Sequence, residues 1–382
     1  MSGQGDSGDE RRAARLGRNE LARYARHLVM PEVGLDGQRA LKSASVLCLG
    51  LGGLGSAAAT YLAAAGVGRL GLIDGDIVDY SNLQRQILHS TGDVGRRKLN
   101  SARDRLRALN PDIQLEQHPG MLGADNARRI VADYDIVLDG SDNYATRYLA
   151  NDVCFWLGRP LVYGAIFRFD GQAGVFAPHL GGGCYRCMMP APPPADTIPS
   201  CAEGGVLGLL PGLVGTIQAT EAVKLALGIG KPLLGRLLTI DTLSMRFAEI
   251  ALARDPGCAL CGARPTVIEP VDYGAFCGER EHARGGLRSI SPGELDQRLA
   301  AGDPLQLVDV REPGEHGGQP LDGSLPLPAS QLPARLSEID PAREVVLVCG
   351  NGVRSESALE LLADAGFTNA RHLDGGLDAW RG

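Results

Sequence analysis

Apolar and polar positions near the start of the chain follow the order strand, helix, strand. Residues 45–50 form a short apolar run, residues 53–65 are rich in alanine and carry no charge, and residues 70–73 form a second apolar run that ends at Asp74. Short apolar runs next to glycines predict buried strands, and the longer segment of small residues predicts a helix between them. The strands of such a βαβ unit pair in parallel, so the pattern predicts a parallel sheet.

The alternation of strands and helices continues to residue 262. Its further elements are predicted as helix 98–109, strand 136–138, strand 161–163, loop 190–199 and helix 212–227. The loop is predicted because its prolines fit neither a helix interior nor a central strand. The whole order indicates a Rossmann-like, doubly wound α/β domain over residues 20–262.

A second module follows a change in composition. After Cys261 the chain becomes rich in Gly, Arg, Glu and Pro, and we expect residues 263–288 to be a linker. The elements predicted beyond it are helix 291–300, strand 305–310, strand 344–349 and helix 355–365. They predict a small α/β domain over residues 289–382, whereas residues 1–19 have no apolar period and are expected to be a mobile arm.

Length and composition agree with two globular domains. The 382 residues exceed what one hydrophobic core organises, and 44% hydrophobic with 22% charged residues are ordinary globular values. A net charge of -7 argues against a surface that binds nucleic acid by neutralising phosphates. The longest apolar run, residues 206–217, is broken by Pro211 and too short for a bilayer, and no signal peptide is visible. We expect a cytoplasmic protein with no nucleic-acid or membrane partner.

The first strand and helix are joined by a glycine-rich motif, Gly50-Leu51-Gly52-Gly53-Leu54-Gly55, which fits G-x-G-x-x-G. In this position the glycines let the backbone approach phosphates at the N-terminus of the helix. Asp74, at the end of the next strand, is suitably placed to accept hydrogen bonds from ribose hydroxyls. Taken alone, the motif predicts a dinucleotide site.

Charged residues downstream change that interpretation. Arg85, Lys98 and Asp142 lie in the segments 81–86, 95–98 and 139–143. Two cations offset phosphate charge and an acid can hold Mg²⁺, which is what phosphoryl displacement requires. An NAD(P)-dependent oxidoreductase explains the glycine motif but not these charges. We therefore predict a site for ATP and Mg²⁺.

Two CxxC pairs among nine cysteines favour metal binding in a reducing compartment. Cys184 and Cys187 form one pair, and Cys258 and Cys261 form the other. Four thiolates close the tetrahedral coordination of Zn²⁺, so the predicted site is structural. A redox dithiol would account for one pair and leave the second unexplained.

Together the motifs of residues 20–262 resemble the E1-like adenylyltransferases of the MoeB type (ThiF family), which activate ubiquitin-like sulfur carriers. The resemblance rests on the glycine motif and the charged segments above, with residues 23–27 before them and residues 201–205 after them, in the family's order. It implies these roles: Gly53 and Asp74 contact the nucleotide, Ser81, Asn82 and Arg85 surround phosphates and ribose, Lys98 binds phosphate, Asp142 organises Mg²⁺, Asn143 completes the pocket, and Arg26 reaches into the partner subunit's ATP site. A homodimer is therefore implied.

Four further cysteines before the second module lie outside the CxxC pairs. Cys48 and Cys154 stand in apolar contexts and are expected to be buried, while Cys277 lies in the expected linker and its role is open. Cys201 follows the Pro-rich loop and matches the family's crossover-loop cysteine. Family members differ in whether that cysteine forms a thioester, a disulfide or nothing essential, so a catalytic Cys201 stays one of these alternatives.

A reactive cysteine is predicted in the second module. Cys349-Gly350-Asn351-Gly352-Val353-Arg354 lies between a strand and a helix, where backbone N–H groups and the helix dipole stabilise a thiolate or an anion bound on it. With residues 309–312 and 375–380, this C-x4-R loop resembles a single rhodanese domain, in which Cys349 and Arg354 would be catalytic. Gly350 and Asn351 depart from the usual loop residues, as does the segment 315–324, which leaves the sulfur donor open.

The two halves together resemble the bifunctional adenylyltransferase–sulfurtransferases of the MoeZ type. The resemblance implies that Mg-ATP adenylates the C-terminal Gly-Gly carboxylate of a small β-grasp sulfur carrier, and that a Cys349 persulfide then gives a carrier thiocarboxylate. A cysteine desulfurase or thiosulfate would load the persulfide. The pathway could be molybdopterin, thiamine, cysteine or thionucleoside synthesis, and a non-catalytic docking scaffold remains a rival interpretation.

Overall fold

The computed structural model describes residues 14–193, 205–271, 273–276, 289–311, 321–350 and 352–381. The chain divides into two compact units, residues 1–279 and 280–382. This division lies inside the segment 263–288 that the composition predicts as a linker.

The first unit is a mixed α/β fold. Its elements are α2 (Arg18–Arg23), α3 (Ala25–Leu28), α4 (Gly34–Ser43), β1 (Ser45–Leu49), α5 (Gly53–Ala65), β2 (Arg69–Asp74), η1 (Tyr80–Asn82), η2 (Thr91–Asp93), α6 (Lys98–Leu109), β3 (Gln114–Pro119), α7 (Ala127–Ala132), β4 (Ile136–Asp139), α8 (Tyr144–Trp156), β5 (Leu161–Phe167), β6 (Asp170–Phe176), η3 (Pro178–Leu180), α9 (Tyr185–Met188), α11 (Leu209–Leu227), β7 (Arg236–Asp241), β8 (Arg246–Ala251) and α12 (Tyr273–Phe276). Helix α2 begins at Arg18, inside the segment expected to be a mobile arm.

Eight strands form one sheet in the order β3-β2-β1-β4-β5-β6-β7-β8. The first five are parallel, as the βαβ pattern predicts. The last three are antiparallel, so the expectation of a wholly parallel sheet is wrong for this half. Short turns join β5 to β6 and β7 to β8. A turn of a few residues can connect only antiparallel neighbours, because a parallel connection needs a longer crossover.

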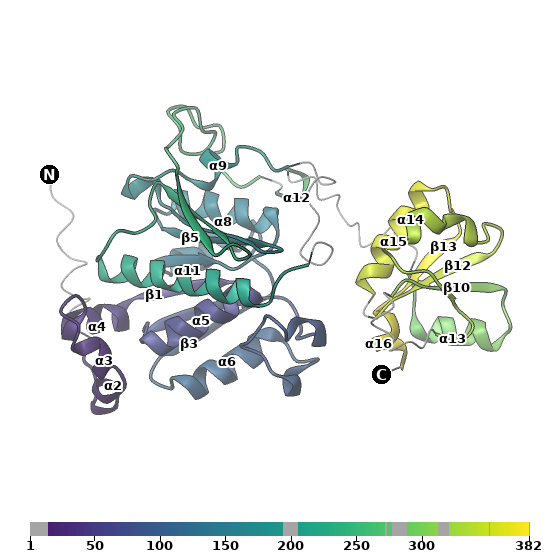
Figure 1. Ribbon diagram of the computed structural model, residues 1–382, viewed down its shortest axis with the longest axis horizontal. Helices are drawn as coiled ribbons and strands as arrows, with labels where there is room; N and C mark the ends of the chain where they lie inside the picture. The colour runs from purple at the N-terminus through teal and green to yellow at the C-terminus, as the bar shows by residue number, and fades with distance from the viewer. Residues whose placement is uncertain are drawn as a thin grey trace. The chain divides into compact units, whose positions relative to one another are not determined.

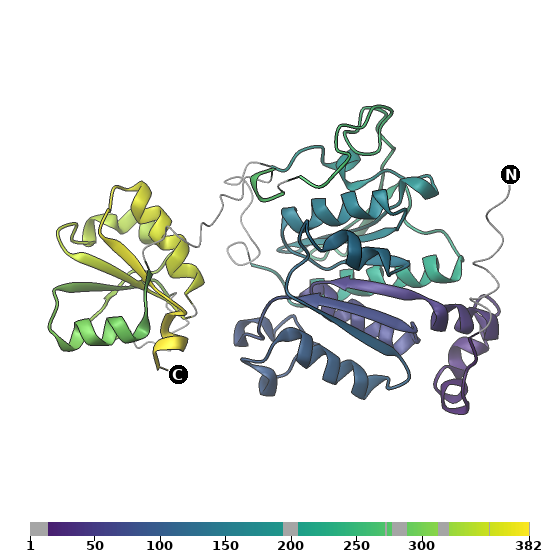
Figure 2. The same ribbon diagram turned by 180° about the vertical axis from the view of Figure 1, so that it is seen from behind.

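Helices cover both faces of the sheet, which confirms the doubly wound prediction (Figures 1 and 2). Side chains of a strand point alternately to opposite faces. In β1, Val46 and Cys48 join the core that contains α5, α6 and α11, whereas Leu47 and Leu49 join the core that contains α7 and α8. The strand β1 is therefore buried on both sides, and the loops at the carboxyl ends of its parallel neighbours meet at one edge.

Helix α11 lies against α5 and the middle of the sheet (Figure 1). It begins at Leu209, three residues before the predicted start, because Pro211 fits the first turn, where no intrahelical N–H is needed. A Cβ on Gly215 would stand 2.4 Å from the Leu54 carbonyl oxygen, so glycine permits the close packing of the two helices. Within the described ranges, no helix is long and apolar enough to cross a membrane.

The second unit is a smaller α/β fold. Its elements are β9 (Ser289–Ile290), α13 (Pro292–Ala300), β10 (Leu305–Asp309), β11 (Leu325–Pro326), α14 (Leu332–Arg335), η4 (Leu336–Glu338), β12 (Glu344–Val348), α15 (Val353–Asp364), β13 (Ala370–Leu373) and α16 (Gly376–Arg381). The five strands are parallel, in the order β11-β10-β12-β13-β9. Val345 and Leu347 of β12 face one core and Val346 and Val348 face another, so both faces of this sheet are buried as well.

Candidate functional site

The glycine motif forms the turn from β1 into α5. Gly50 has a φ of +80°, and a Cβ there would stand 3.0 Å from the Gly140 carbonyl oxygen. Gly55 lies inside α5, where a Cβ would stand 1.9 Å from the Gly50 carbonyl oxygen. The first and last glycines thus permit a tight turn and close packing, while Gly52, as the N-cap of α5, leaves the backbone open to a ligand.

A cavity of about 950 Å³ opens at this turn. The predicted nucleotide residues that line it are Gly50, Gly52, Gly53, Asp74, Arg85, Lys98, Asp142 and Asn143. They belong to three connections at the carboxyl edge of the parallel strands: β1 to α5, β2 to α6 and β4 to α8. The cavity continues over the antiparallel strands β6 to β8, where Asp170, Asp241 and Arg246 line it. A nucleotide and a second, extended ligand could therefore bind side by side.

Asp74 is fixed at the base of this cavity. Its carboxylate accepts hydrogen bonds from the Leu51 N–H at 2.7 Å and the Asp76 N–H at 2.8 Å. Burial raises the pKa of Asp74, while nearby Lys98 and the two N–H groups act in the opposite direction. The side chain ties the glycine turn to the end of β2, which keeps the nucleotide loop in shape.

The two predicted cations already have partners. Lys98 is nearly buried, and its Nζ lies 2.8 Å from Oδ2 of Asp76. The Arg85 guanidinium donates to the Ser81 carbonyl oxygen at 3.1 Å. Asp76 lines the cavity but was not singled out by the sequence. Its position two residues beyond Asp74, just after a strand end, could have indicated that Asp76 lies at the site.

The loop that carries Asp142 is held by a buried arginine, Arg147. Its Nε donates to the Asp139 carboxylate at 3.2 Å, and its Nη2 donates to the Ser141 carbonyl oxygen at 3.0 Å. Burial disfavours the charge on Arg147, but Tyr163 and Asp139 raise its pKa above the usual value. Sequence reasoning missed Arg147, because a single arginine in a helical segment gives no sign of burial.

Some predicted nucleotide residues do not line the cavity. Ser81 donates to the Asp79 carboxylate in η1, and Asn82 belongs to the same capping arrangement. Arg26 is exposed on α3. Asn143, in contrast, does line the cavity, but its side-chain oxygen already accepts a hydrogen bond from the Thr146 N–H at 2.8 Å and so caps α8.

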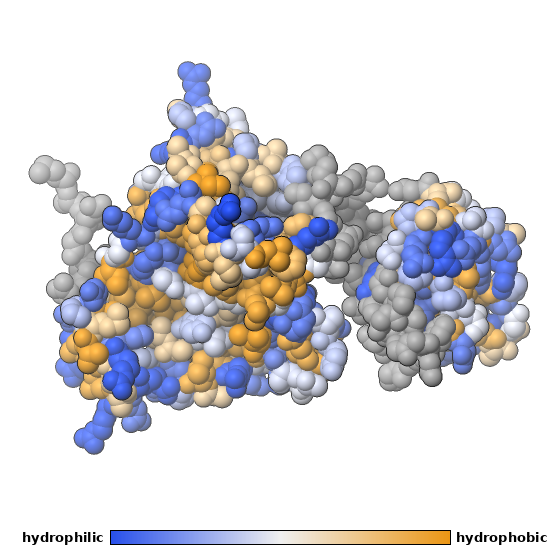
Figure 3. Space-filling model, viewed as in Figure 1, coloured by the Kyte–Doolittle hydropathy of each residue, from blue (hydrophilic) through white to orange (hydrophobic). Residues whose placement is uncertain are grey.

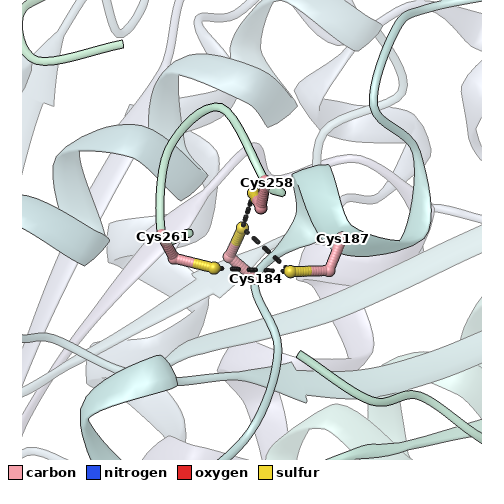
Figure 4. A group of neighbouring side chains, drawn as sticks. All are labelled: Cys184, Cys187, Cys258 and Cys261. Atoms are coloured by element: carbon pink, nitrogen blue, oxygen red, sulfur yellow. Dashed lines mark hydrogen bonds between the residues drawn. The ribbon is translucent and has the colours of Figure 1, made fainter. Parts of the chain in front are cut away.

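The two CxxC pairs meet in space. Their four sulfur atoms lie within 4.8 Å of one another, and Figure 4 shows them pointing toward a common centre. Three of the sulfur–sulfur distances are 3.3 Å for Cys187 to Cys261, 3.5 Å for Cys184 to Cys258 and 3.8 Å for Cys184 to Cys187. A tetrahedral ion with Zn–S bonds of about 2.3 Å needs sulfur atoms about 3.8 Å apart. The group therefore fits Zn²⁺ with four thiolates.

The thiols of the cluster differ in charge state: the hydrogen bond to Cys187 and burial raise the pKa of Cys184, and burial raises that of Cys261, whereas Cys187 is held as a thiolate. A hydrogen bond from the Cys184 thiol lowers the pKa of Cys187 to about 4, and the Asp255 N–H donates to the Cys187 sulfur at 3.4 Å. A thiolate is the form of cysteine that ligates metal.

An ion pair supports the first CxxC pair. Arg186, between the two cysteines, donates twice to the Asp152 carboxylate, at 2.8 and 2.7 Å. Both side chains are buried. Tyr273 of α12 donates to the same carboxylate at 3.0 Å, and the Arg186 guanidinium lies 4.7 Å from the ring centre of Phe276. Helix α12 thus belongs to the first unit, although its residues fall in the expected linker.

Cys349 in the second unit directly follows β12, in the loop that leads to α15, and is 1% exposed. The N–H groups of Gly352 and Ser355 donate to its sulfur at 3.2 and 3.3 Å. Gly352 has a φ of +91°, which turns the backbone toward the sulfur. Gly376 packs so closely that a Cβ would stand 2.5 Å from the Cys349 carbonyl oxygen. The predicted anion-stabilising loop is present, and Arg354 stands in the first turn of α15.

The remaining cysteines divide into two groups. Cys48 and Cys154 are buried, as predicted, and burial raises the pKa of Cys48 to about 12. Cys201 and Cys277 lie outside the described residues, and so does Asn351. The expectations for these three residues stay predictions.

Comparison with known families decides between the interpretations. Residues 24–260 match the ThiF family and residues 291–382 match the rhodanese-like domain. The chain belongs to the ThiF family. Its ThiF adenylation domain carries the glycine-rich cavity and the cysteine cluster, and its C-terminal rhodanese domain carries Cys349. The recognition made from the motifs is confirmed.

Three relatives are similar to this ThiF-family chain, two of them along nearly its whole length. The probable adenylyltransferase/sulfurtransferase MoeZ of Mycobacterium tuberculosis is 47% identical, over 96% of this chain and 94% of its own. The mouse adenylyltransferase and sulfurtransferase MOCS3 is 42% identical, over 96% of this chain and 86% of its own. The sulfur carrier protein adenylyltransferase of Thermus thermophilus is 52% identical, over 69% of this chain and 98% of its own.

The fold also matches solved structures. The crystal structure of E. coli MccB with ATP has a TM-score of 0.56 at 22% identity, over 66% of this chain and 76% of that chain. At this identity the likeness concerns the fold.

Proposed function

We propose that this protein adenylates the C-terminal carboxylate of a ubiquitin-like sulfur carrier and then transfers sulfur to it from Cys349. The observation that carries the proposal is the cavity in which the glycine turn, Arg85, Lys98 and Asp142 lie together. Its support from relatives is the match to adenylyltransferase–sulfurtransferases over 96% of the chain. An oxidoreductase would not need this set of charges around its cofactor.

In the first reaction, the carrier carboxylate attacks the α-phosphate of ATP, a P–O bond forms, and pyrophosphate leaves. The N–H groups at the start of α5 bind phosphate oxygens, and Lys98 and Arg85 balance the charge that develops on the leaving group. To bind phosphate, Lys98 exchanges its ion pair with Asp76, whose side chain is 64% exposed and can turn to solvent. Asp74 is placed to bind the ribose.

Two metal ions belong to the proposal. Asp142 is exposed toward the cavity and would hold Mg²⁺, which neutralises phosphate charge when bound. The four clustered cysteines would hold Zn²⁺ as a structural ion, since four thiolates leave no position for a substrate.

In the second reaction, the terminal sulfur of a Cys349 persulfide attacks the acyl-adenylate carbonyl and AMP leaves. The product is an acyl disulfide between carrier and Cys349. A second thiol, for which Cys201 is the candidate of this chain, attacks the Cys349 sulfur and releases the carrier thiocarboxylate. The attacking thiolate supplies the electron pair: a new S–S bond forms with Cys349, the S–S bond of the acyl disulfide breaks, and the thiocarboxylate leaves with the electrons of that bond.

We further propose a cytoplasmic homodimer whose persulfide is supplied by a cysteine desulfurase or by thiosulfate. Arg26 would complete the partner subunit's ATP site, in keeping with its exposure on α3. Apolar surface gathers on the face of the first unit around α11 (Figure 3), and Leu209 at its start is 79% exposed. Exposed apolar patches of this kind are typical of protein interfaces.

The adenylation half is tested by ATP–pyrophosphate exchange with recombinant carriers. We expect exchange that requires a carrier and that Asp142→Ala abolishes, while thiosulfate-to-cyanide sulfur transfer continues. Normal exchange in this variant would remove Asp142 from its assigned role. Turnover of NAD would contradict the whole assignment.

The sulfur-transfer half is tested by the intact mass of the carrier. Replacement of a terminal oxygen by sulfur adds about 16 mass units to the carrier. Cys349→Ala should block this gain and leave pyrophosphate exchange near the wild-type rate. Thiocarboxylate formed by Cys349→Ala at the wild-type rate would favour a docking role for the rhodanese domain.

A further inference from the structure

Ser355 contacts the reactive sulfur twice, and no part of the mechanism above uses its hydroxyl group. The side chain is fully buried in the first turn of α15. Its N–H donates to Sγ of Cys349 at 3.3 Å, and its Oγ lies 3.5 Å from the same sulfur, as the acceptor of the thiol S–H. The Oγ also donates to the Gly352 carbonyl oxygen at 2.9 Å.

These contacts form a chain from the thiol through the hydroxyl to a carbonyl. A hydroxyl has one hydrogen to donate and can turn it between two acceptors. While Cys349 carries its proton, the Ser355 hydrogen points to Gly352. Once the proton has left, Sγ becomes the stronger, charged acceptor within reach, and a hydrogen bond to a charged acceptor is the stronger kind.

We propose that Ser355 is a catalytic residue of the rhodanese domain, whose hydroxyl turns from the Gly352 carbonyl to Sγ of Cys349 and stabilises the thiolate. This inference rests on the proposed sulfur transfer through Cys349. It concerns the two states in which Sγ carries charge: the thiolate that takes up sulfur and the thiolate that is released when cyanide removes the sulfur in the assay.

Both steps balance without a further reagent. In loading, the Cys349 thiolate attacks the outer sulfur of thiosulfate, an S–S bond forms, and sulfite leaves with the electron pair. In the assay reaction, cyanide attacks the terminal sulfur, a C–S bond forms, the S–S bond breaks, and its electron pair returns to Sγ. Ser355 donates to Sγ at the start of the first step and at the end of the second.

Alanine at position 355 tests this role. It retains the backbone N–H that donates to Sγ and favours the helical conformation of α15, so it removes the hydroxyl without a reason to unfold the unit. We expect the pH midpoint of Cys349 alkylation, followed by peptide mass, to rise by about one unit and thiocyanate formation at neutral pH to fall about tenfold. Ser355→Thr, which keeps the hydroxyl, should restore both.

Ser324→Ala is the matched control. Ser324 in the same unit also donates to a backbone carbonyl, that of Leu321 at 2.6 Å. The variant should leave the pH midpoint of alkylation and the rate of thiocyanate formation unchanged. A packing role for Ser355 would lower the melting temperature of Ser355→Ala but leave its alkylation profile at the wild-type position. That result, or an equal shift in Ser324→Ala, would overturn the proposal. Thiocyanate formation by Cys349→Ala would instead contradict the proposed function itself.

Discussion

The buried pair Asp152–Arg186 gives a quantitative test of the first unit. Asp152→Asn keeps the size of the side chain and removes its charge. Arg186, 2% exposed, is then a buried cation without its counterion. Removing one partner of a buried pair costs about 3–5 kcal/mol. We expect the low end, about 3 kcal/mol, because the amide oxygen still accepts one hydrogen bond and the guanidinium still lies against Phe276.

Urea unfolding measures this loss. Trp156 packs against the cysteine cluster and reports on the first unit, and a Trp380→Phe background removes the signal of the other tryptophan. With an m value of about 3 kcal/mol per molar, the midpoint should fall by about 1 M. Because Arg186 stands between Cys184 and Cys187, the variant should also lose zinc to a chelator faster than the wild type.

A surface pair provides the comparison. Arg236 and Glu249 lie 2.7 Å apart but are 32% and 50% exposed. Glu249→Gln should cost less than about 1 kcal/mol, since solvent screens an exposed pair. If Asp152→Asn costs no more than Glu249→Gln, the argument from burial is refuted.

Three more outcomes are expected. Gly50→Ala, which forces a side chain onto a φ of +80° and toward the Gly140 carbonyl oxygen, should weaken ATP binding by at least about tenfold in titration calorimetry, while a wild-type Kd would contradict the role of the turn. Purified protein should contain one zinc ion per four-cysteine cluster, and Cys258→Ser should lower both zinc content and melting temperature; metal-free wild-type protein, purified without chelators, would disprove the site. Burial lowers the pKa of His89, which bonds to the Leu51 carbonyl oxygen. The contribution of His89 to stability is therefore complete above pH about 6.5 and is lost as the pH falls through the lower pKa of the folded state. His89→Gln should flatten the plot of stability against pH in this range, and an unchanged plot would contradict the role of His89.

Local sequence determined the parallel half of the first sheet and the turns that carry chemistry. Short apolar runs that end in Gly50, Asp74 and Asp139 mark strand ends, because buried strands need apolar side chains on both faces and the turns after them need glycine or a polar cap. The same holds for the loop from Cys349 to Gly352 in the second unit. The spacing of the CxxC pairs likewise predicted a metal site of four cysteines, and the structure brings the four sulfur atoms together.

Tertiary structure decided which of these turns share a site. Arg85 and Lys98 belong to the connection from β2 to α6, whereas Asp142 follows β4; the strand order brings these two segments to one edge, which spacing alone does not encode. Tertiary structure also decided which charged side chains are buried. Arg147 and Arg186 are charged residues that composition assigns to the surface, and they are stable inside because Asp139 and Asp152, from other segments, neutralise them there.

The antiparallel strands and α12 are further elements that the sequence alone did not predict. Strand β8 is exposed along its whole length, so it has no apolar alternation to reveal it, and its pairing with β7 through the backbone is what holds it in the sheet. Tyr273 and Phe276 stand in a segment with the composition of a linker. They form a helix because Tyr273 donates a hydrogen bond to Asp152 and the Phe276 ring lies against the Arg186 guanidinium. These partners are distant in the sequence, so the contacts form only when the chain folds.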